Sequence, residues 1–215
     1  MNKRTPKSII WDLDGTLIDS YSVIVSSLYN TLMEKEIMYS TDDIFHYVKE
    51  KSVHQFIEKI ASEYNFPYNE LKSRYSAISK NEQKSLKRMP NAKEILELLV
   101  QQGVQNFIYT HRGLSTFEVV KDAKIINNFK EIVTSSNGFK RKPDPEALIY
   151  LIDKYSLDKE HTFYVGDRTV DIECSRNAGI ISILLITNNS NIQYTAAPDY
   201  AINNLIEINN ILNYK

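Results

Sequence analysis

The stretch Ile9-Ile10-Trp11-Asp12-Leu13-Asp14-Gly15-Thr16-Leu17 decides how the rest of the chain is interpreted. In it, a short apolar run ends in two aspartates two residues apart. Side chains at positions i and i+2 of an extended chain point to the same side, so we expect the two carboxylates to start close together. Carboxylates that close repel each other unless a cation lies nearby. The pattern predicts a strand tip that holds a hard metal ion or presents an aspartate as a nucleophile; the alternative is a simple Asp-Gly turn.

The composition is that of an ordinary globular protein, and it excludes several classes of partner. The chain has 215 residues, which suits one large domain or a domain with an insertion. The net charge of -1 gives no electrostatic reason to expect nucleic acid or an anionic membrane as a partner. The single cysteine, Cys174, excludes an internal disulfide framework, and an unreactive small residue is the favoured interpretation. No apolar run approaches the roughly 20 residues of a membrane helix, so we expect a cytoplasmic protein.

Glycine placement separates a helical segment from the rest of the chain. All six glycines lie outside residues 16–102, and the segment 17–88 has one proline, Pro67. Apolar residues in this segment recur three and four positions apart, as in amphipathic helices. They include Val23, Leu28, Leu32, Ile44, Tyr47, Val48, Phe56, Ile57 and Ile60. We therefore predict a helical cap domain of residues 17–88, inserted after the first strand. Helices that belong to the main core are the alternative, disfavoured because no strand separates them.

The sequence from residue 89 onward alternates between strand-like and helix-like segments. Strands are expected at 106–110, 131–135, 162–166 and 180–186, and helices at 90–102, 114–123, 145–155 and 168–177. Strands separated by helices of this length predict a parallel sheet covered on both faces. The expected fold class is α/β, with a Rossmann-like parallel sheet core of residues 1–16 and 89–215 and the helical cap inserted into it.

Polar side chains recur where the expected strands end. They are Asp12 and Asp14, then Thr110, then Ser135 and Ser136, then Asp167. Ligands of open parallel sheets bind beyond the carboxyl ends of the strands. The Thr110 hydroxyl can donate to a phosphate oxygen, and the helix that follows offers backbone N–H groups to the same anion. A β-branched residue that merely ends a strand is the alternative interpretation.

Two further motifs bring charge to the same edge. Lys140-Arg141-Lys142 places three cations just before an expected helix, where positive charge can neutralise phosphate and carboxylates; a solvated surface loop is the alternative. Asp167 and Asp171 lie four residues apart at a strand-to-helix junction, a spacing that is unfavourable without a counterion. Mg²⁺, which prefers oxygen ligands, is the natural candidate. Zinc is disfavoured because the four histidines and Cys174 lack ligand spacing.

Taken in chain order, these motifs resemble those of the haloacid dehalogenase (HAD) superfamily. The motifs are Asp-x-Asp-Gly-Thr, a strand ending in threonine, Lys-Pro-Asp-Pro, and Gly-Asp-x-x-x-Asp. The helical segment between the first and second motifs is similar to the first cap class of the family. Within the superfamily, the chain resembles the phosphoglycolate-phosphatase-like enzymes. The resemblance implies the HAD fold, Mg²⁺ as cofactor, and a small-molecule phosphate ester as substrate.

The resemblance also implies roles for individual residues. Asp12 would be the nucleophile that forms an aspartyl-phosphate, and Asp14 the general acid and base. Thr110 and Lys142 would bind the transferred phosphoryl group. Mg²⁺ would be held by the Asp12 carboxylate and the Asp14 backbone carbonyl, together with Asp167 and, directly or through water, Asp171.

One position departs from the pattern of the family. His111 and Arg112 follow Thr110 where a shorter polar pair is more usual. We count both as candidate substrate-binding residues. Arg112 either contacts a substrate anion or is solvated, and the sequence does not separate these two interpretations.

The leading hypothesis is a Mg²⁺-dependent phosphatase that hydrolyses a small phosphorylated metabolite of the phosphoglycolate or sugar-phosphate class. Asp14 disfavours carbon–halogen cleavage, because the dehalogenases of the superfamily differ at this position. A phosphomutase of the β-phosphoglucomutase type is the nearest alternative, and a non-catalytic binding or regulatory module is the alternative from another class. The cap would act as a lid that excludes water. A monomer and a homodimer are both compatible with the sequence.

Overall fold

The computed structural model describes residues 7–187 and 192–213. The chain divides into an α/β unit, formed by Met1–Asp19 and Arg88–Lys215, and a helical unit, formed by Ser20–Lys87. The expected fold class, a parallel-sheet core with a helical insertion, is confirmed. Residues 1–6 of the predicted core lie outside the described part of the chain.

The α/β unit is built on a six-stranded parallel sheet with the order β5-β4-β1-β6-β7-β8. Its strands are β1 (Ser8–Trp11), β4 (Gln105–Tyr109), β5 (Glu131–Val133), β6 (Thr162–Gly166), β7 (Ile181–Leu185) and β8 (Tyr200–Ile202). The chain adds β4 and β5 on one side of β1, and then β6, β7 and β8 on the other. The carboxyl end of β1 is therefore the switch point of the sheet, where ligands of such sheets bind.

The pairing of β1 with its two neighbours determines which residues lie at the carboxyl edge of the sheet. Trp11 pairs with Ile108 of β4 and with Val165 of β6. Ile9, Ile10 and Trp11 are completely buried, which explains the continuous apolar run, because both faces of a parallel sheet are covered. The Asp12 N–H donates to the Val165 carbonyl at 2.8 Å, so the ladder continues one residue beyond β1. Asp12 is thus held rigidly at the strand tip.

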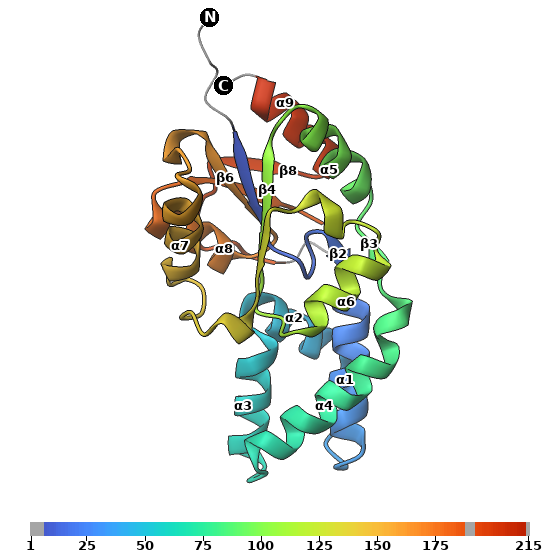
Figure 1. Ribbon diagram of the computed structural model, residues 1–215. Coiled ribbons are helices and arrows are strands. Elements are labelled where there is room, and N and C mark those ends of the chain that lie inside the picture. The colour runs from blue at the N-terminus through green and yellow to red at the C-terminus, as the bar shows by residue number, and fades with distance from the viewer. Residues whose placement is uncertain (1–6, 188–191, 214–215) are drawn as a thin grey trace, which may run out of the picture. The chain divides into compact units, whose positions relative to one another are not determined.

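Helices cover both faces of the sheet. They are α5 (Ala92–Gln101), α6 (Ser115–Asp122), α7 (Glu146–Tyr155), α8 (Thr169–Ala178) and α9 (Ile208–Asn213). Figure 1 shows α7 and α8 on one side of the sheet and α5 and α9 on the other. The side under α7 and α8 has a continuous core that includes Ile10, Phe107, Leu148, Leu151 and Tyr164. Apart from α9, both layers follow from the alternation of strands and helices in the sequence.

Some short elements were not anticipated. The sequence patterns gave no strand or helix beyond residue 186, whereas β8 and α9 lie there. β8 is an edge strand of three residues with mixed burial, too short for a clear pattern. A two-stranded sheet, β2 (Ile18–Asp19) and β3 (Lys87–Arg88), lies where the chain leaves and re-enters the α/β unit. Two-residue strands carry no detectable periodicity.

The helical unit contains four helices. They are α1 (Tyr21–Met33), α2 (Thr41–Glu50), α3 (Val53–Glu63) and α4 (Tyr68–Glu82). Ser40 and Ser52 cap α2 and α3, because each hydroxyl accepts a hydrogen bond from the backbone N–H three residues later. All of the apolar residues predicted to face inward are buried, except Tyr47, which is half-buried.

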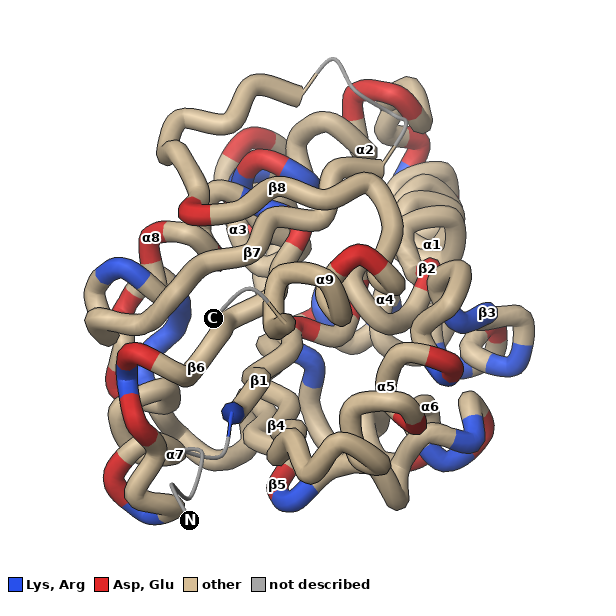
Figure 2. Tube along the Cα trace, turned by 90° about the horizontal axis from the view of Figure 1, so that it is seen from above, with Lys and Arg blue, Asp and Glu red and all other residues tan. Residues whose placement is uncertain are grey.

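The described residues show no helix that is long and apolar enough to cross a membrane. Figure 2 shows basic and acidic positions interspersed along the chain, in keeping with the net charge of -1.

Phe56→Ala tests the packing of the helical unit. The Phe56 side chain is completely buried and makes edge-to-face contacts with Tyr39 and Tyr47 at centroid distances of 5.6 and 5.4 Å. We expect the substitution to lower the free energy of unfolding by about 3–5 kcal/mol, because it removes buried apolar area and leaves a cavity. Urea denaturation measures the loss. Tyr64→Ala, at a side chain that is 42% exposed, is the control and should change stability far less. Equal losses in the two variants would contradict this packing.

Candidate active site at the carboxyl edge of the sheet

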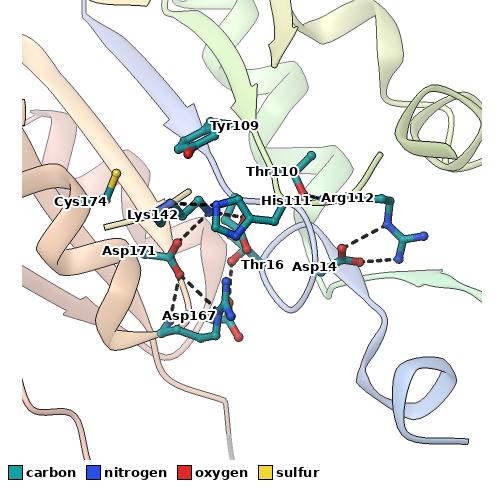
Figure 3. Close-up of polar contacts among 12 residues, drawn as sticks. Asp14, Thr16, Tyr109, Thr110, His111, Arg112, Lys142, Asp167, Asp171 and Cys174 are labelled. Atoms are coloured by element: carbon teal, nitrogen blue, oxygen red, sulfur yellow. Dashed lines mark hydrogen bonds and ion pairs between the residues drawn. The ribbon is translucent and has the colours of Figure 1, made fainter. Parts of the chain in front are cut away.

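A buried ammonium group lies at the centre of the site. Lys142 comes from the loop before α7, and its side chain is completely buried. Its Nζ donates to Asp12 Oδ1 at 2.6 Å and to Asp171 Oδ1 at 2.8 Å. The Nζ also lies 5.0 Å from the ring centroid of Tyr109 and 5.2 Å from that of Tyr164, in the range of cation–π attraction. Figure 3 shows Lys142 between Tyr109 and Asp171.

Several hydrogen bonds fix the loop that carries Lys142. The Lys142 N–H donates to His111 Nε2 at 2.9 Å, and the Tyr109 hydroxyl donates to the Lys140 carbonyl at 3.1 Å. The Tyr164 hydroxyl lies 3.3 Å from Asp171 Oδ1, so it supports the second carboxylate that binds Lys142. Tyr109 and Tyr164 belong to the two strands that flank β1. The sheet itself therefore positions the lysine.

The junction between β6 and α8 carries the other two acidic residues, Asp167 just before the helix and Asp171 in its first turn. Asp171 Oδ2 accepts the Arg168 N–H at 3.1 Å, an N-terminal capping contact that fixes the carboxylate. Asp167 Oδ1 lies 3.4 Å from the Thr16 hydroxyl, which joins the turn after β1 to the end of β6. Gly166 precedes them, and a Cβ atom there would lie 2.4 Å from Asp171 Cβ. The site needs glycine at this position because the strand and the helix approach so closely.

Asp12, Asp167 and Asp171 form a candidate metal centre. All three are buried, and one carboxylate oxygen from each lies within 4.8 Å of the others. Carboxylate oxygens are the ligands that hard divalent cations such as Mg²⁺ prefer. When all three are ionised, these carboxylates outnumber the two cations beside them, Lys142 and Arg168, whose Nε lies 4.0 Å from Asp171 Oδ2. The donor set therefore fits a divalent cation.

The pKa values of the paired carboxyls support this fit. Burial raises the pKa of Asp12 to about 7, although the charge of Lys142 acts to lower it. Burial also acts to raise the pKa of Asp171, but the charges of Lys142 and Arg168 and the hydrogen bonds to Asp171 outweigh it and lower that pKa. Asp171 therefore ionises more readily than Asp12. An additional cation would lower the pKa of Asp12 and favour its carboxylate form.

The second aspartate of the opening motif does not join this cluster. Asp14 Oδ2 accepts from Arg112 Nε at 3.1 Å, and Asp14 Oδ1 accepts from Arg112 Nη2 at 2.6 Å. The Thr110 hydroxyl oxygen accepts the Arg112 N–H at 3.1 Å. Of the two candidate substrate-binding residues, His111 contacts the Lys142 backbone and Arg112 contacts Asp14. The solvated alternative for Arg112 does not hold, since its side chain is only 12% exposed.

Sequence reasoning missed Tyr109, Tyr164 and Arg168 as parts of the site. The two tyrosines lie in buried strands, where a phenol hydroxyl needs a polar partner, and this need was the only available signal. Cys174 lies behind the site with its thiol 3.4 Å from the Asp144 carbonyl. Burial raises the pKa of this thiol to about 12, so the unreactive interpretation of Cys174 agrees with the structure.

The fold and this site define an α/β enzyme with a carboxylate-rich centre at the switch point of its sheet. The chain belongs to the haloacid dehalogenase-like hydrolase family, whose model matches residues 9–185. It is similar to pyrophosphatase PpaX of Bacillus mycoides, with 27% identity over 95% of this chain and 96% of the relative. It is also similar to a phosphoglycolate phosphatase of Mannheimia succiniciproducens, with 26% identity over 82% of this chain and 80% of the relative.

A solved structure supports the same fold. The crystal structure of a predicted phosphoglycolate phosphatase from Haemophilus somnus matches with a TM-score of 0.83 and 22% identity. The match covers 96% of this chain and 97% of that protein. At this level of identity the likeness concerns the fold alone, and it agrees with the family assignment.

Gly166→Ala tests the close approach of β6 and α8. The new methyl group would overlap Asp171, whose Cβ is attached to the helix backbone and cannot rotate away. We expect the free energy of unfolding to fall by about 1–3 kcal/mol, the usual cost of overpacking. Chemical denaturation measures this loss. Gly113→Ala is the matched control, since its Cβ would meet its nearest atoms at ordinary distances of 3.7 and 3.8 Å. A variant at Gly166 as stable as this control would refute the steric argument.

Lys142→Met tests the charge balance of the centre. Without added metal, the variant should lose about 3–5 kcal/mol of stability, because buried carboxylates lose their cation. Added Mg²⁺ should then raise the melting temperature of the variant more than that of the wild type, as the cation replaces the missing charge. Thermal unfolding with and without Mg²⁺ measures both effects. Lys154→Met, at a half-exposed lysine that pairs with Glu131, should leave the response to Mg²⁺ unchanged. A melting temperature that does not respond to Mg²⁺ in either protein would contradict a metal centre here.

Proposed function

We propose that the protein is a Mg²⁺-dependent phosphatase that hydrolyses a small phosphorylated metabolite through an aspartyl-phosphate on Asp12. The observation that carries this proposal is the Lys142 ammonium group between Asp12 and Asp171, with Asp167 beside them, at the switch point of the sheet. Such a centre suits phosphoryl transfer, in which catalysis consists mostly of positioning and charge stabilisation.

The class of reaction, phosphoric monoester hydrolysis, rests on the family and on the relatives. The family model describes hydrolases. The relatives carry the names pyrophosphatase and phosphoglycolate phosphatase, and they match most of the chain. The substrates in both names are small and contain a phosphoryl group attached through oxygen. We therefore propose a substrate of this size, with phosphoglycolate, pyrophosphate and sugar phosphates as the classes to examine first.

In the first step, the Asp12 carboxylate attacks phosphorus and the bond from phosphorus to the leaving oxygen breaks. Asp14 donates a proton to that oxygen as general acid. Lys142, already bound to Asp12, offsets the negative charge of the phosphoryl group, and the Thr110 hydroxyl donates to one of its oxygens. The leaving group departs as an alcohol or as a second phosphate.

In the second step, Asp14 accepts a proton from a water molecule, and that water attacks the phosphorus of the aspartyl-phosphate. The bond between phosphorus and the Asp12 oxygen breaks, which releases inorganic phosphate and restores the carboxylate. Asp167, Asp171, the Asp12 carboxylate and the Asp14 backbone carbonyl are the groups that would hold Mg²⁺. The bound ion would reduce the repulsion between the phosphate dianion and the anionic nucleophile.

The proposal includes the domain division that the sequence predicts. Residues 1–16 and 89–215 form the catalytic part, and residues 17–88 form the cap. All of the catalytic and metal-binding residues assigned above belong to the catalytic part. A phosphomutase would use the same residues, and only the fate of the phosphoryl group distinguishes the two activities.

Phosphate release tests the function. With Mg²⁺ the protein should release inorganic phosphate from p-nitrophenyl phosphate, and a chelator should abolish the release. Asp12→Asn should lower the rate by at least about 10³-fold, because it removes the nucleophile. Asp158→Asn, at a surface aspartate that pairs with His161, is the matched control and should retain full activity.

Two outcomes would reject the phosphatase. No turnover of pyrophosphate or of any ester in a broad panel of phosphate esters would favour a binding or regulatory module. Conversion of a sugar 1-phosphate to its 6-phosphate without net release of phosphate would favour the mutase.

A further inference from the structure

A guanidinium group lies directly on the proposed general acid. Arg112 binds both oxygens of Asp14 through Nε and Nη2, at 3.1 and 2.6 Å. Two parallel bonds of this kind fix the relative orientation of the two groups. The side chains are 12% and 23% exposed, so the pair lies at the margin of the site, neither deeply buried nor fully solvated. Figure 3 shows this pair on the far side of Thr110 from Asp167 and Asp171.

The backbone of Arg112 is anchored on both sides. Its N–H donates to the Thr110 hydroxyl oxygen at 3.1 Å, and its carbonyl accepts the Ser135 N–H at 3.1 Å. These contacts tie the residue to the ends of β4 and β5. The guanidinium group therefore belongs to the carboxyl edge of the sheet and is not part of a loose surface loop.

The charge of Arg112 is separate from the metal centre. Lys142 binds Asp12 and Asp171, whereas Arg112 binds Asp14, which lies outside the three-carboxylate cluster. In the proposed mechanism Asp14 contacts the leaving oxygen. A group that contacts Asp14 consequently lies close to the position of the leaving group. A planar guanidinium group matches a carboxylate or a phosphate in this position better than it matches any uncharged group.

We propose that Arg112 selects substrates whose leaving group carries a second anion, a carboxylate or a phosphate, close to the bridging oxygen. This inference rests on the proposed function, because it uses the role of Asp14. An anionic leaving group is attracted to the guanidinium group and is oriented towards the general acid. An uncharged leaving group gains neither effect. Arg112 is then a specificity-determining residue that recognises the leaving group of the substrate.

A matched pair of substrates tests the inference. The pair is 2-phosphoglycolate and its amide, which share the bridging oxygen and the carbon chain and differ only in the second charge. The wild type should have the higher kcat/KM for the acid. Arg112→Gln should lower kcat/KM for the acid about 10- to 100-fold more than for the amide, the size expected for a lost charged hydrogen bond. Arg112→Lys keeps the charge without the planar guanidinium group. Its acid-to-amide ratio of kcat/KM should lie between those of the wild type and Arg112→Gln.

Two controls make the outcome specific. Arg176→Gln removes an arginine on α8 that donates to the Ala197 carbonyl at the surface, and it should leave the acid-to-amide ratio unchanged. If Arg112 only orients Asp14, its substitution slows both substrates equally, and this result would overturn the inference. A wild type that shows no preference for the acid would overturn it as well. If Arg112→Gln does not fold, Arg112→Met replaces it, and an unchanged acid-to-amide ratio in that variant has the same meaning.

Failure of the inference is distinguishable from failure of the proposed function. Release of phosphate from p-nitrophenyl phosphate by the wild type, and its loss in Asp12→Asn, depend on the function alone. If this activity is present and the acid-to-amide ratio does not respond to Arg112, then only the role of Arg112 is wrong.

Discussion

The contact of the Lys142 ammonium group with two buried carboxylates is the interaction on which the site depends. It joins the end of β1, the loop before α7 and the first turn of α8, three segments far apart in the sequence. Removal of the lysine charge would leave two buried carboxylates without their shared partner, which costs more than the contacts contribute. His111 and Tyr109 hydrogen-bond to the loop that carries Lys142, and Tyr164 hydrogen-bonds to Asp171. These bonds support the charged contact.

The order of the strands explains why these groups meet. β1 lies between β4 and β6. After β1 the chain adds strands on one side of it, and after β5 it adds strands on the other side. The connections consequently diverge above β1 and leave room for polar side chains. Tyr109 from β4 and Tyr164 from β6 flank that space, and Asp12 stands between them on the central strand. A sheet without this reversal would cover the same edge with its own connections.

Much of this arrangement could be predicted from local patterns. The polar ends of buried strands indicated Asp12, Thr110 and Asp167, because parallel strands bring their carboxyl ends to one edge. The contact between Arg112 and Asp14 could not be predicted, since it joins residues 98 positions apart and depends on side-chain direction. The same holds for His111, whose partner is a backbone N–H 31 positions away. Short edge elements such as β8 were missed because three residues carry too little pattern.

The burial of Cys174 has a practical consequence for work with this protein. It is the only cysteine of the chain, its side chain is inaccessible, and its pKa is about 12, so almost no thiolate forms near neutral pH. Thiol-directed reagents react with the thiolate and need access to it. A cysteine introduced at the surface of either unit would therefore be the single reactive thiol of an otherwise unaltered chain. A fluorescent or spin label could then be attached at one chosen position, without first replacing a native residue.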